Sequence, residues 1–118
     1  MKDNIYFQYI NSIDLDQLLP LSPRPNTRFV PWMNCFRVTS ASQFNYLDFE
    51  DYMYKQGIQV RPFFSNLAYQ NAFAQTSLHA DLLITDNIAG SGFYLPSGIT
   101  LSNNDIRIIS DHVNAYFR

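Results

Sequence analysis

The sequence predicts a single small α+β domain in which helices and short strands alternate and pack in layers. Its 118 residues are enough for one hydrophobic core and too few for two independent ones. Charged residues make up 15% and hydrophobic residues 47%, a balance that favours a folded chain over a disordered one. The apolar spacing then changes between helical and strand periods, in the order helix, strand, helix, strand, helix, strand, helix.

The first helix is predicted over residues 4–13, because Ile5, Tyr9 and Ile13 recur on one helical face. Three prolines follow closely and cannot continue a helix, so residues 14–29 are expected to form a linker. The compact α/β part is then expected over residues 30–118.

Residues 30–39 are predicted to form a strand covered on much of both faces, because both alternating sets of side chains contain apolar members. The next helix has Asn45 as its expected N-cap and ends before Gly57, the expected left-handed residue after the helix. A second strand is predicted over residues 58–63, and Pro62 favours an edge position for it.

Residues 66–74 are compatible with a helical turn, and residues 81–91 with a weaker helix that Gly90 or Gly92 ends. A short third strand is expected over residues 93–95. The last helix is the clearest, since Ser102 and Asp105 have the spacing of a capping box before a regular apolar face.

Composition argues against several partners. The net charge of −2 provides no basic field for nucleic acid or anionic lipid, and no apolar run is long enough to span a bilayer. The N-terminus lacks the apolar run of a signal peptide. The single cysteine, Cys35, excludes an internal disulfide and fits a reducing, cytoplasmic compartment.

The usual chemical signatures are weak, and no catalytic residue or metal ligand is predicted. His79 and His112 stand alone, and Cys35 has no second cysteine to share a metal. The run Ser110-Asp111-His112 would point in different directions on a helix, so it does not predict a triad. The glycines of 90–92 lack the third glycine of a dinucleotide fingerprint, and they more simply end a helix.

The segment GIQVRPFF, residues 57–64, differs from ordinary core sequence. Arg61 precedes a rigid proline and two adjacent aromatic residues, Phe63 and Phe64, which would point to opposite faces of a strand. One ring is expected in the core, and the other facing solvent, a ligand or another domain. Pairing of Arg61 with a nearby carboxylate is the alternative interpretation of its charge.

Several motifs in order resemble the C-terminal part of the DegT/DnrJ/StrS-type nucleotide-sugar aminotransferases, most closely the perosamine-synthetase-like enzymes. The matching motifs are Trp32-Met33, Gly57-Ile58, Arg61-Pro62-Phe63-Phe64, the AF pair at 72–73, Leu95-Pro96-Ser97-Gly98 and Ser102. The resemblance implies the small C-terminal domain of the fold-type-I transferases, with a short, mostly antiparallel sheet of about three strands packed against helices. Residues 1–13 would then be the end of the interdomain helix.

Enzymes of this family use pyridoxal phosphate to transfer an amino group, usually from glutamate, to a nucleotide-linked keto sugar. The chain matches only their small domain, and its two lysines, Lys2 and Lys55, stand at a chain end and in a helix's last turn. Neither position suits a Schiff base, which needs an amine held in a pocket. The resemblance therefore implies pyridoxal phosphate for the full-length enzyme, but neither the cofactor nor activity for this chain alone.

By the same resemblance, Arg61, Phe63, Phe64 and Ser65 would contact the nucleotide sugar, since a guanidinium suits a diphosphate and an aromatic ring packs on a sugar or base. The expected partners are a large cofactor-binding domain or chain, the nucleotide-diphosphate sugar and a second copy in a homodimer. A stand-alone binding or docking module and a remnant of a split gene remain alternatives. Apolar side chains facing the missing partner are expected to be exposed: Phe64, Tyr69, Phe73, Tyr6 and Tyr9.

Overall fold

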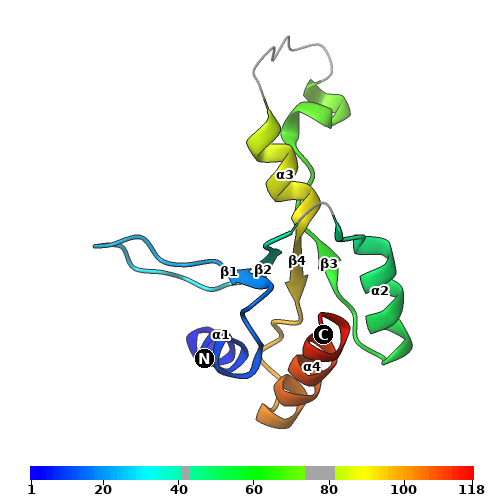
Figure 1. Ribbon diagram of the computed structural model, residues 1–118. Coiled ribbons are helices and arrows are strands. Elements are labelled where there is room, and N and C mark those ends of the chain that lie inside the picture. Colours follow the sequence, from blue (N-terminus) through cyan, green and yellow to red (C-terminus); the bar gives the residue numbers. More distant parts are fainter. Residues whose placement is uncertain (41–42, 74–81) are drawn as a thin grey trace.

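An antiparallel sheet lies at the centre of the molecule, and helices pack on one of its faces (Figure 1). The computed structural model describes residues 1–40, 43–73 and 82–118. The strands are β1 (Leu18–Pro20), β2 (Asn34–Val38), β3 (Arg61–Pro62) and β4 (Gly92–Leu95), in the order β1-β2-β4-β3. The helices are α1 (Lys2–Ser12), α2 (Tyr46–Lys55), α3 (Leu83–Ser91) and α4 (Asn103–Tyr116), with short 3₁₀ turns η2 (Leu67–Tyr69) and η3 (Asn71–Phe73).

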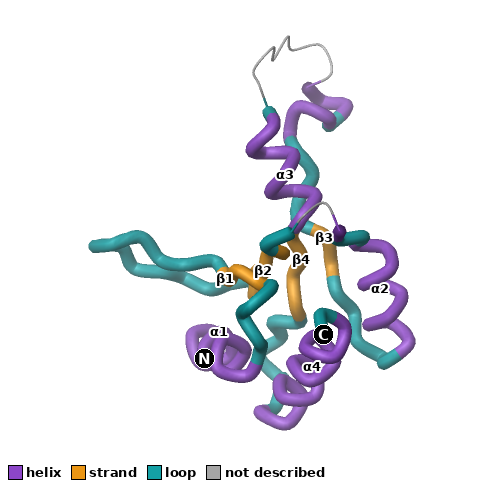
Figure 2. The backbone as a smooth tube through the Cα atoms, viewed as in Figure 1, coloured by secondary structure: helices purple, strands orange, loops and turns teal. Residues whose placement is uncertain are grey.

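The core forms where α1, α2 and α4 meet one face of the sheet (Figure 2). Alternate residues of the two central strands point into it, among them Phe36 of β2 and Phe93 of β4, both fully buried. Phe49 of α2 packs on Phe93 with ring centroids 4.5 Å apart. The predicted α+β class is therefore confirmed, and among the described residues the sheet has four strands where about three were expected.

The helix ends form as their sequences predict. The Asn45 side chain accepts a hydrogen bond from the backbone N–H of Leu47, and Gly57 follows α2 with φ +75°. At the start of α4, Ser102 and Asp105 form the complete capping box. These hydrogen bonds satisfy backbone groups of the first turn of each helix and fix where the helices begin.

The segment expected as a linker, residues 14–29, contains the short strand β1, which was not predicted. Leu18, Leu19 and Pro20 pair with Val38, Arg37 and Phe36, and Leu18 is buried. A three-residue strand is too short to be recognised from the spacing of its side chains. It forms because β2 offers an unpaired edge with which it can hydrogen-bond. Pro20 fits there because an edge strand can do without one N–H.

The strand predicted over residues 58–63 pairs only at Arg61 and Pro62. In this register Gln59 would stand opposite Pro96, which has no N–H to donate. The ladder therefore ends early, although Pro62 lies on an edge strand as predicted.

Helix α1 contributes to the common core through Ile5, Tyr9 and Ile13. Tyr6 and Tyr9 were expected to be exposed, and this is wrong, since they are 5% and 0% exposed. The Tyr9 hydroxyl donates a hydrogen bond to the Pro96 carbonyl at 3.0 Å, as does the Asn34 side-chain amide at 3.1 Å. Together they anchor the loop between β4 and α4.

The turns η2 and η3 and helix α3 form an arm that rises from the sheet (Figure 1). Asp86 of α3 holds the two sides together by accepting hydrogen bonds from Asn66 Nδ2 at 2.9 Å and from the Tyr69 hydroxyl at 2.8 Å. The turn predicted over 66–74 and the helix predicted over 81–91 match these elements, and residues 74 and 81 lie outside the described ranges.

Candidate ligand-binding groove

The sheet face opposite the core carries the side chains of the candidate site. Tyr94 of β4 pairs with Cys35 on one side and Arg61 on the other, and cross-strand partners share a face. In the neighbouring row Arg37 stands opposite Gly92. The side chains of Cys35, Arg37, Arg61 and Tyr94 are half-buried or exposed, whereas Gly92 is buried. In the described part of the chain this face of the sheet is therefore accessible.

Neither Phe63 nor Phe64 enters the core, which corrects the expectation that one of them would. Phe63 donates its backbone N–H to the Gly92 carbonyl, so its side chain lies on the open face, half-buried beside Tyr94 at 4.9 Å between ring centroids. Phe64 is 69% exposed and contacts the same tyrosine at 5.5 Å. We call Phe63, Phe64 and Tyr94 the aromatic shelf.

Arg61 is exposed beside this shelf, and the described residues include no carboxylate in an ion pair with it. Its charge is felt by Tyr46 of α2, where burial and a hydrogen bond to Glu50 raise the pKa of the phenol and Arg61 acts in the opposite direction. The printed ion pairs join Lys55 to Asp51 and Arg107 to Asp111. The geometry therefore does not favour the alternative in which Arg61 serves an internal ion pair.

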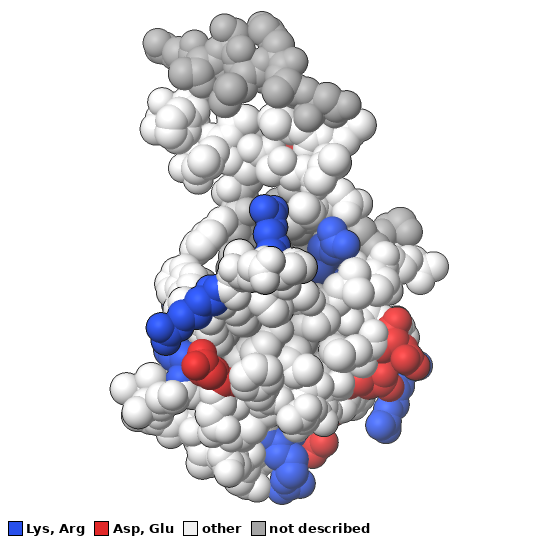
Figure 3. Space-filling view, turned by 90° about the vertical axis from the view of Figure 1, so that its left-hand side faces the viewer, with Lys and Arg blue, Asp and Glu red and all other residues white. Residues whose placement is uncertain are grey.

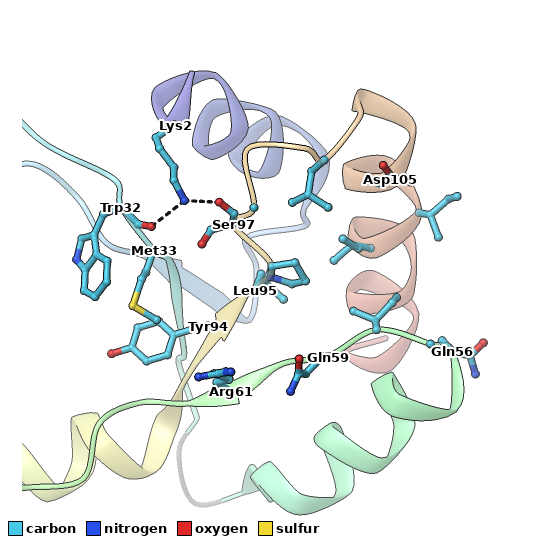
Figure 4. Close-up of a pocket in the computed structure, with 17 residues that line it drawn as sticks. Lys2, Trp32, Met33, Gln56, Gln59, Arg61, Tyr94, Leu95, Ser97 and Asp105 are labelled. Carbon is cyan, nitrogen blue, oxygen red and sulfur yellow. Dashed lines mark hydrogen bonds between the residues drawn. The ribbon is translucent and has the colours of Figure 1, made fainter.

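Two adjoining hollows form a groove around Arg61. One, of about 500 Å³, is lined by all four predicted site residues, Arg61, Phe63, Phe64 and Ser65. The other, of about 790 Å³, continues past Tyr94 toward α4 and Lys2. Both hollows share Trp32, Met33, Arg61 and Tyr94, so we treat them as one groove. Figure 4 shows the residues that line the hollow of about 790 Å³.

The groove residues that were not predicted as site residues include Lys2, Trp32 and Tyr94. Trp32 is the one tryptophan of the chain and is 64% exposed. Its position within the strand predicted over residues 30–39 gave it a place in the family motif but no predicted role in a site. A large aromatic side chain that is left exposed is a signal only the tertiary structure provides.

Three of the residues that line the groove are charged: Lys2, Arg61 and Asp105. On the face drawn in Figure 3, basic and acidic side chains are scattered over a mostly neutral surface. A ligand would therefore meet individual cations rather than a broad field.

Other candidate sites fail on geometry. Ser110 is buried and donates to the Ile106 carbonyl at 2.8 Å, whereas Asp111 faces Arg107, so the run 110–112 forms no triad. Within residues 1–40, 43–73 and 82–118 no three potential metal ligands gather, and His79 lies outside these ranges. None of the helices in the described part is long and apolar enough to cross a membrane.

The residues present do not fit covalent attachment of pyridoxal phosphate. Lys55 is 68% exposed and its Nζ lies 2.6 Å from an Asp51 carboxylate oxygen. The Lys2 amine donates to the main-chain carbonyls of Trp32 and Ser97. A Schiff-base lysine needs an amine held free in a desolvated pocket, and neither lysine is so placed.

Solved structures with the same fold are much longer than this chain. TlmJ, an aminotransferase from Streptoalloteichus hindustanus, superposes with a TM-score of 0.81 at 19% identity, over 98% of this chain and 31% of its own. Helicobacter pylori PseC, an aminotransferase involved in the biosynthesis of pseudoaminic acid, gives 0.84 at 14% identity, over 98% and 32%. The putative sugar aminotransferase Spr1654 from Streptococcus pneumoniae, in its PMP form, gives 0.78 at 18% identity, over 97% and 29%. A comparison with curated proteins found no match.

The fold therefore defines the small α+β domain found in fold-type-I aminotransferases, and the chain spans about a third of the length of these structures. The model of the DegT/DnrJ/EryC1/StrS aminotransferase family matches residues 2–114. The chain belongs to this family.

Proposed function

We propose that this chain is the small domain of a pyridoxal-phosphate-dependent aminotransferase acting on nucleotide-linked keto sugars, and that it is inactive alone. The observation that carries the proposal is the groove on the open sheet face, where Arg61 stands beside the aromatic shelf and Ser65. A guanidinium can donate two hydrogen bonds at the same time to the oxygens of a diphosphate, and aromatic rings pack on a sugar or a base. We assign contact with the nucleotide sugar to Arg61, Phe63, Phe64 and Ser65.

The reaction itself requires a second, large domain or chain that supplies the cofactor and its lysine. The length of the similar structures, about three times that of this chain, supports such a partner. The ordered motifs from Trp32 to Ser102 favour the perosamine-synthetase-like group, with a product used in cell-surface polysaccharide. The single cysteine fits the cytoplasm, and assembly as a homodimer is part of the proposal.

Reconstitution tests this function. The purified chain is mixed with pyridoxal phosphate alone, and then with a separately produced large, cofactor-binding domain of an aminotransferase of this family. We expect no internal aldimine absorbance in the first mixture, and glutamate-dependent amination of a nucleotide keto sugar in the second. A stoichiometric aldimine on the isolated chain, or a stable complex without amination, would contradict the proposal.

A stand-alone binding or docking module is the second candidate, because residues of this chain alone form the groove. Such a module would bind nucleotide sugars by calorimetry and would show no dependence on a large-domain chain. Tight association with that chain and no heat with any nucleotide sugar would instead indicate a purely structural complement.

A further inference from the structure

We propose that Asp86 is a positioning residue for the groove: through hydrogen bonds from Asn66 and Tyr69, it fixes the segment that carries Phe64 and Ser65. The inference rests on the proposed function for the role of the groove in binding a substrate. It goes beyond that function because Asp86 lies on α3, is not among the residues that line the groove, and acts on a ligand only through other residues.

The Asp86 carboxylate joins the two sides of the arm. Among the described residues 64–73 and 82–91, which include the arm, it is the one charged group. Its Oδ1 atom accepts a hydrogen bond from Asn66 Nδ2 at 2.9 Å, and its Oδ2 atom accepts one from the Tyr69 hydroxyl at 2.8 Å. Both donors belong to the side of the arm that contains η2 (Figure 1). Because hydrogen bonds to an ionised acceptor are stronger than neutral ones, this contact is a firm attachment between the two sides.

Asn66 connects this carboxylate to the groove. Its side chain is 7% exposed, and both of its polar groups are used. Oδ1 accepts from the Ala68 backbone N–H at 3.0 Å, and Nδ2 donates to Asp86. A buried amide bonded at both ends has one favourable orientation, since turning it over would place like groups against each other. Asn66 directly follows Ser65, so an Asn66 held in place also determines where Ser65 lies.

The other end of the segment is attached to β4. The backbone N–H of Phe63 donates to a β4 carbonyl at 3.1 Å. Burial raises the pKa of Tyr94, and a hydrogen bond from the Phe64 backbone acts in the opposite direction. A hollow of about 270 Å³ is lined by residues 63–67, by α3 and by Tyr94, so segment, arm and strand meet there. Ser65 therefore lies between one attachment to β4 and another to α3.

Exchanging the two side chains of the contact tests the proposal. Asn66→Asp keeps an oxygen for the Ala68 N–H, but it turns a second carboxylate toward Asp86, so repulsion should separate the two sides. Combining Asn66→Asp with Asp86→Asn again places a donor opposite an acceptor, and this double variant should return to the wild-type arrangement. Asn87→Asp adds the same charge at an exposed neighbouring residue of α3 and is the matched control.

Nuclear magnetic resonance of the isotope-labelled chain is the first readout. The rings of Phe64 and Tyr94 have centroids 5.5 Å apart, so they should give nuclear Overhauser effects in the wild type. We expect the same effects in Asn87→Asp and in the double variant, and their loss in Asn66→Asp. Asp86→Ala, which removes the acceptor without adding a charge, should lose them too.

Tyr69 provides an independent signature of the contact. The hydrogen bond to Asp86 is the main cause that raises the pKa of Tyr69, because ionisation would remove the donated proton beside a negative charge. In Asp86→Ala the pKa of Tyr69, followed by the chemical shifts of its ring, should fall toward the ordinary value of 10.0. A merely structural role of Asp86, without this hydrogen bond, would leave the Tyr69 titration unchanged.

The reconstituted enzyme supplies a third readout. With a separately produced large domain, Asn66→Asp should raise the KM for the nucleotide sugar by about tenfold, the usual effect of losing one hydrogen bond to a charged group. Because the segment binds substrate and transition state alike, kcat should stay close to that of the wild type. The double variant with Asp86→Asn should recover the wild-type KM.

Circular dichroism checks that each variant is folded, and Asp86→Ala decides the question if Asn66→Asp does not fold. Ring contacts retained in Asp86→Ala, or a double variant that behaves like Asn66→Asp, would overturn the inference. Amination by the reconstituted wild type together with unchanged ring contacts in the variants would refute this inference and leave the proposed function standing. The expected loss of ring contacts, with no amination by any reconstituted protein, would do the reverse.

Discussion

The Phe63 ring lies directly over Gly92 on the open face of the sheet. A Cβ atom built on Gly92 would stand 2.2 Å from Cδ2 of that ring, closer than real Cβ contacts come. The ring can pack beside Tyr94 only because position 92 has no side chain. Gly92 therefore determines how the segment from Arg61 to Ser65 lies against the sheet.

Gly92→Ala should displace Phe63 and destabilise the domain by about 1–3 kcal/mol, the usual cost of overpacking. Urea unfolding measures the change. Gly90→Ala is the matched control, because nothing lies within 4 Å of its Cβ position. It should be neutral or stabilise α3 by up to about 1 kcal/mol. Equal stability of the two variants would contradict the packing argument, and adding Phe63→Ala to Gly92→Ala should remove the clash.

The Cys35 thiol should react slowly with alkylating reagents in the folded protein. Burial raises its pKa from the ordinary 9.0 to about 11, which lowers the thiolate fraction at mildly alkaline pH. Alkylation of the native protein should therefore be about a hundredfold slower than in concentrated urea. A variant with Cys35→Ser and Ser22→Cys, which moves the thiol to an exposed position, should react at the ordinary rate. Similar native and denatured rates for the wild type would contradict the prediction.

The same shift makes stability depend on alkaline pH. Because the folded pKa of Cys35 lies above its unfolded value, its contribution to stability is complete below about pH 9 and is lost as the pH rises toward 11. Tyrosines with raised pKa values, Tyr9 among them, act in the same direction above pH 10. The urea concentration at the midpoint of unfolding should therefore be constant near neutral pH and decrease at alkaline pH. Cys35→Ser should reduce the decrease between about pH 9 and pH 11.

Ser102→Ala should destabilise the protein by about 1 kcal/mol through loss of the α4 cap. The hydroxyl accepts from the Asp105 backbone N–H at 3.1 Å, while the Asp105 carboxylate accepts from the Ser102 hydroxyl and N–H. Thr100→Ala, in the same loop outside the capping box, should have little effect in the same urea series. Since Ser102 lowers the pKa of Asp105, the deficit should shrink as the pH falls below 3.8 and Asp105 becomes protonated.

The arm should cause self-association at high concentration. Phe64, which leads into the arm, and Leu67 and Ile84 of the arm are between 61% and 78% exposed, and exposed apolar surface favours association. In sedimentation velocity, the sedimentation coefficient of the wild type should increase with protein concentration. The double variant Phe64→Ser with Ile84→Ser should abolish this increase. Leu47→Ser changes an equally exposed leucine on α2 and should leave association intact. A wild-type monomer at every concentration would contradict this prediction.

Local patterns predicted the elements whose determinants lie within a few residues of one another. The Asn45 cap, the Gly57 turn and the Ser102–Asp105 box each satisfy backbone groups of their own helix, so spacing alone identifies them. All four residues predicted from the motifs around Arg61 line one hollow, and their contact with a ligand stays a prediction.

Tertiary structure decided what depends on partners distant in the chain. β1 forms only because β2 presents an edge to it, and β3 ends where Pro96 would have to pair. Phe63 stays outside the core because Gly92, 29 residues later, leaves space for it on the other face. Lys2 reaches the groove only because α1 folds beside the loop after β4, where the Lys2 amine donates to the Ser97 carbonyl. The sequence by itself thus determined the fold class, the helix caps and the position of Arg61, because short-range hydrogen bonding and periodicity encode them. The shape and charge of the groove depend on contacts between remote segments, which no local pattern records.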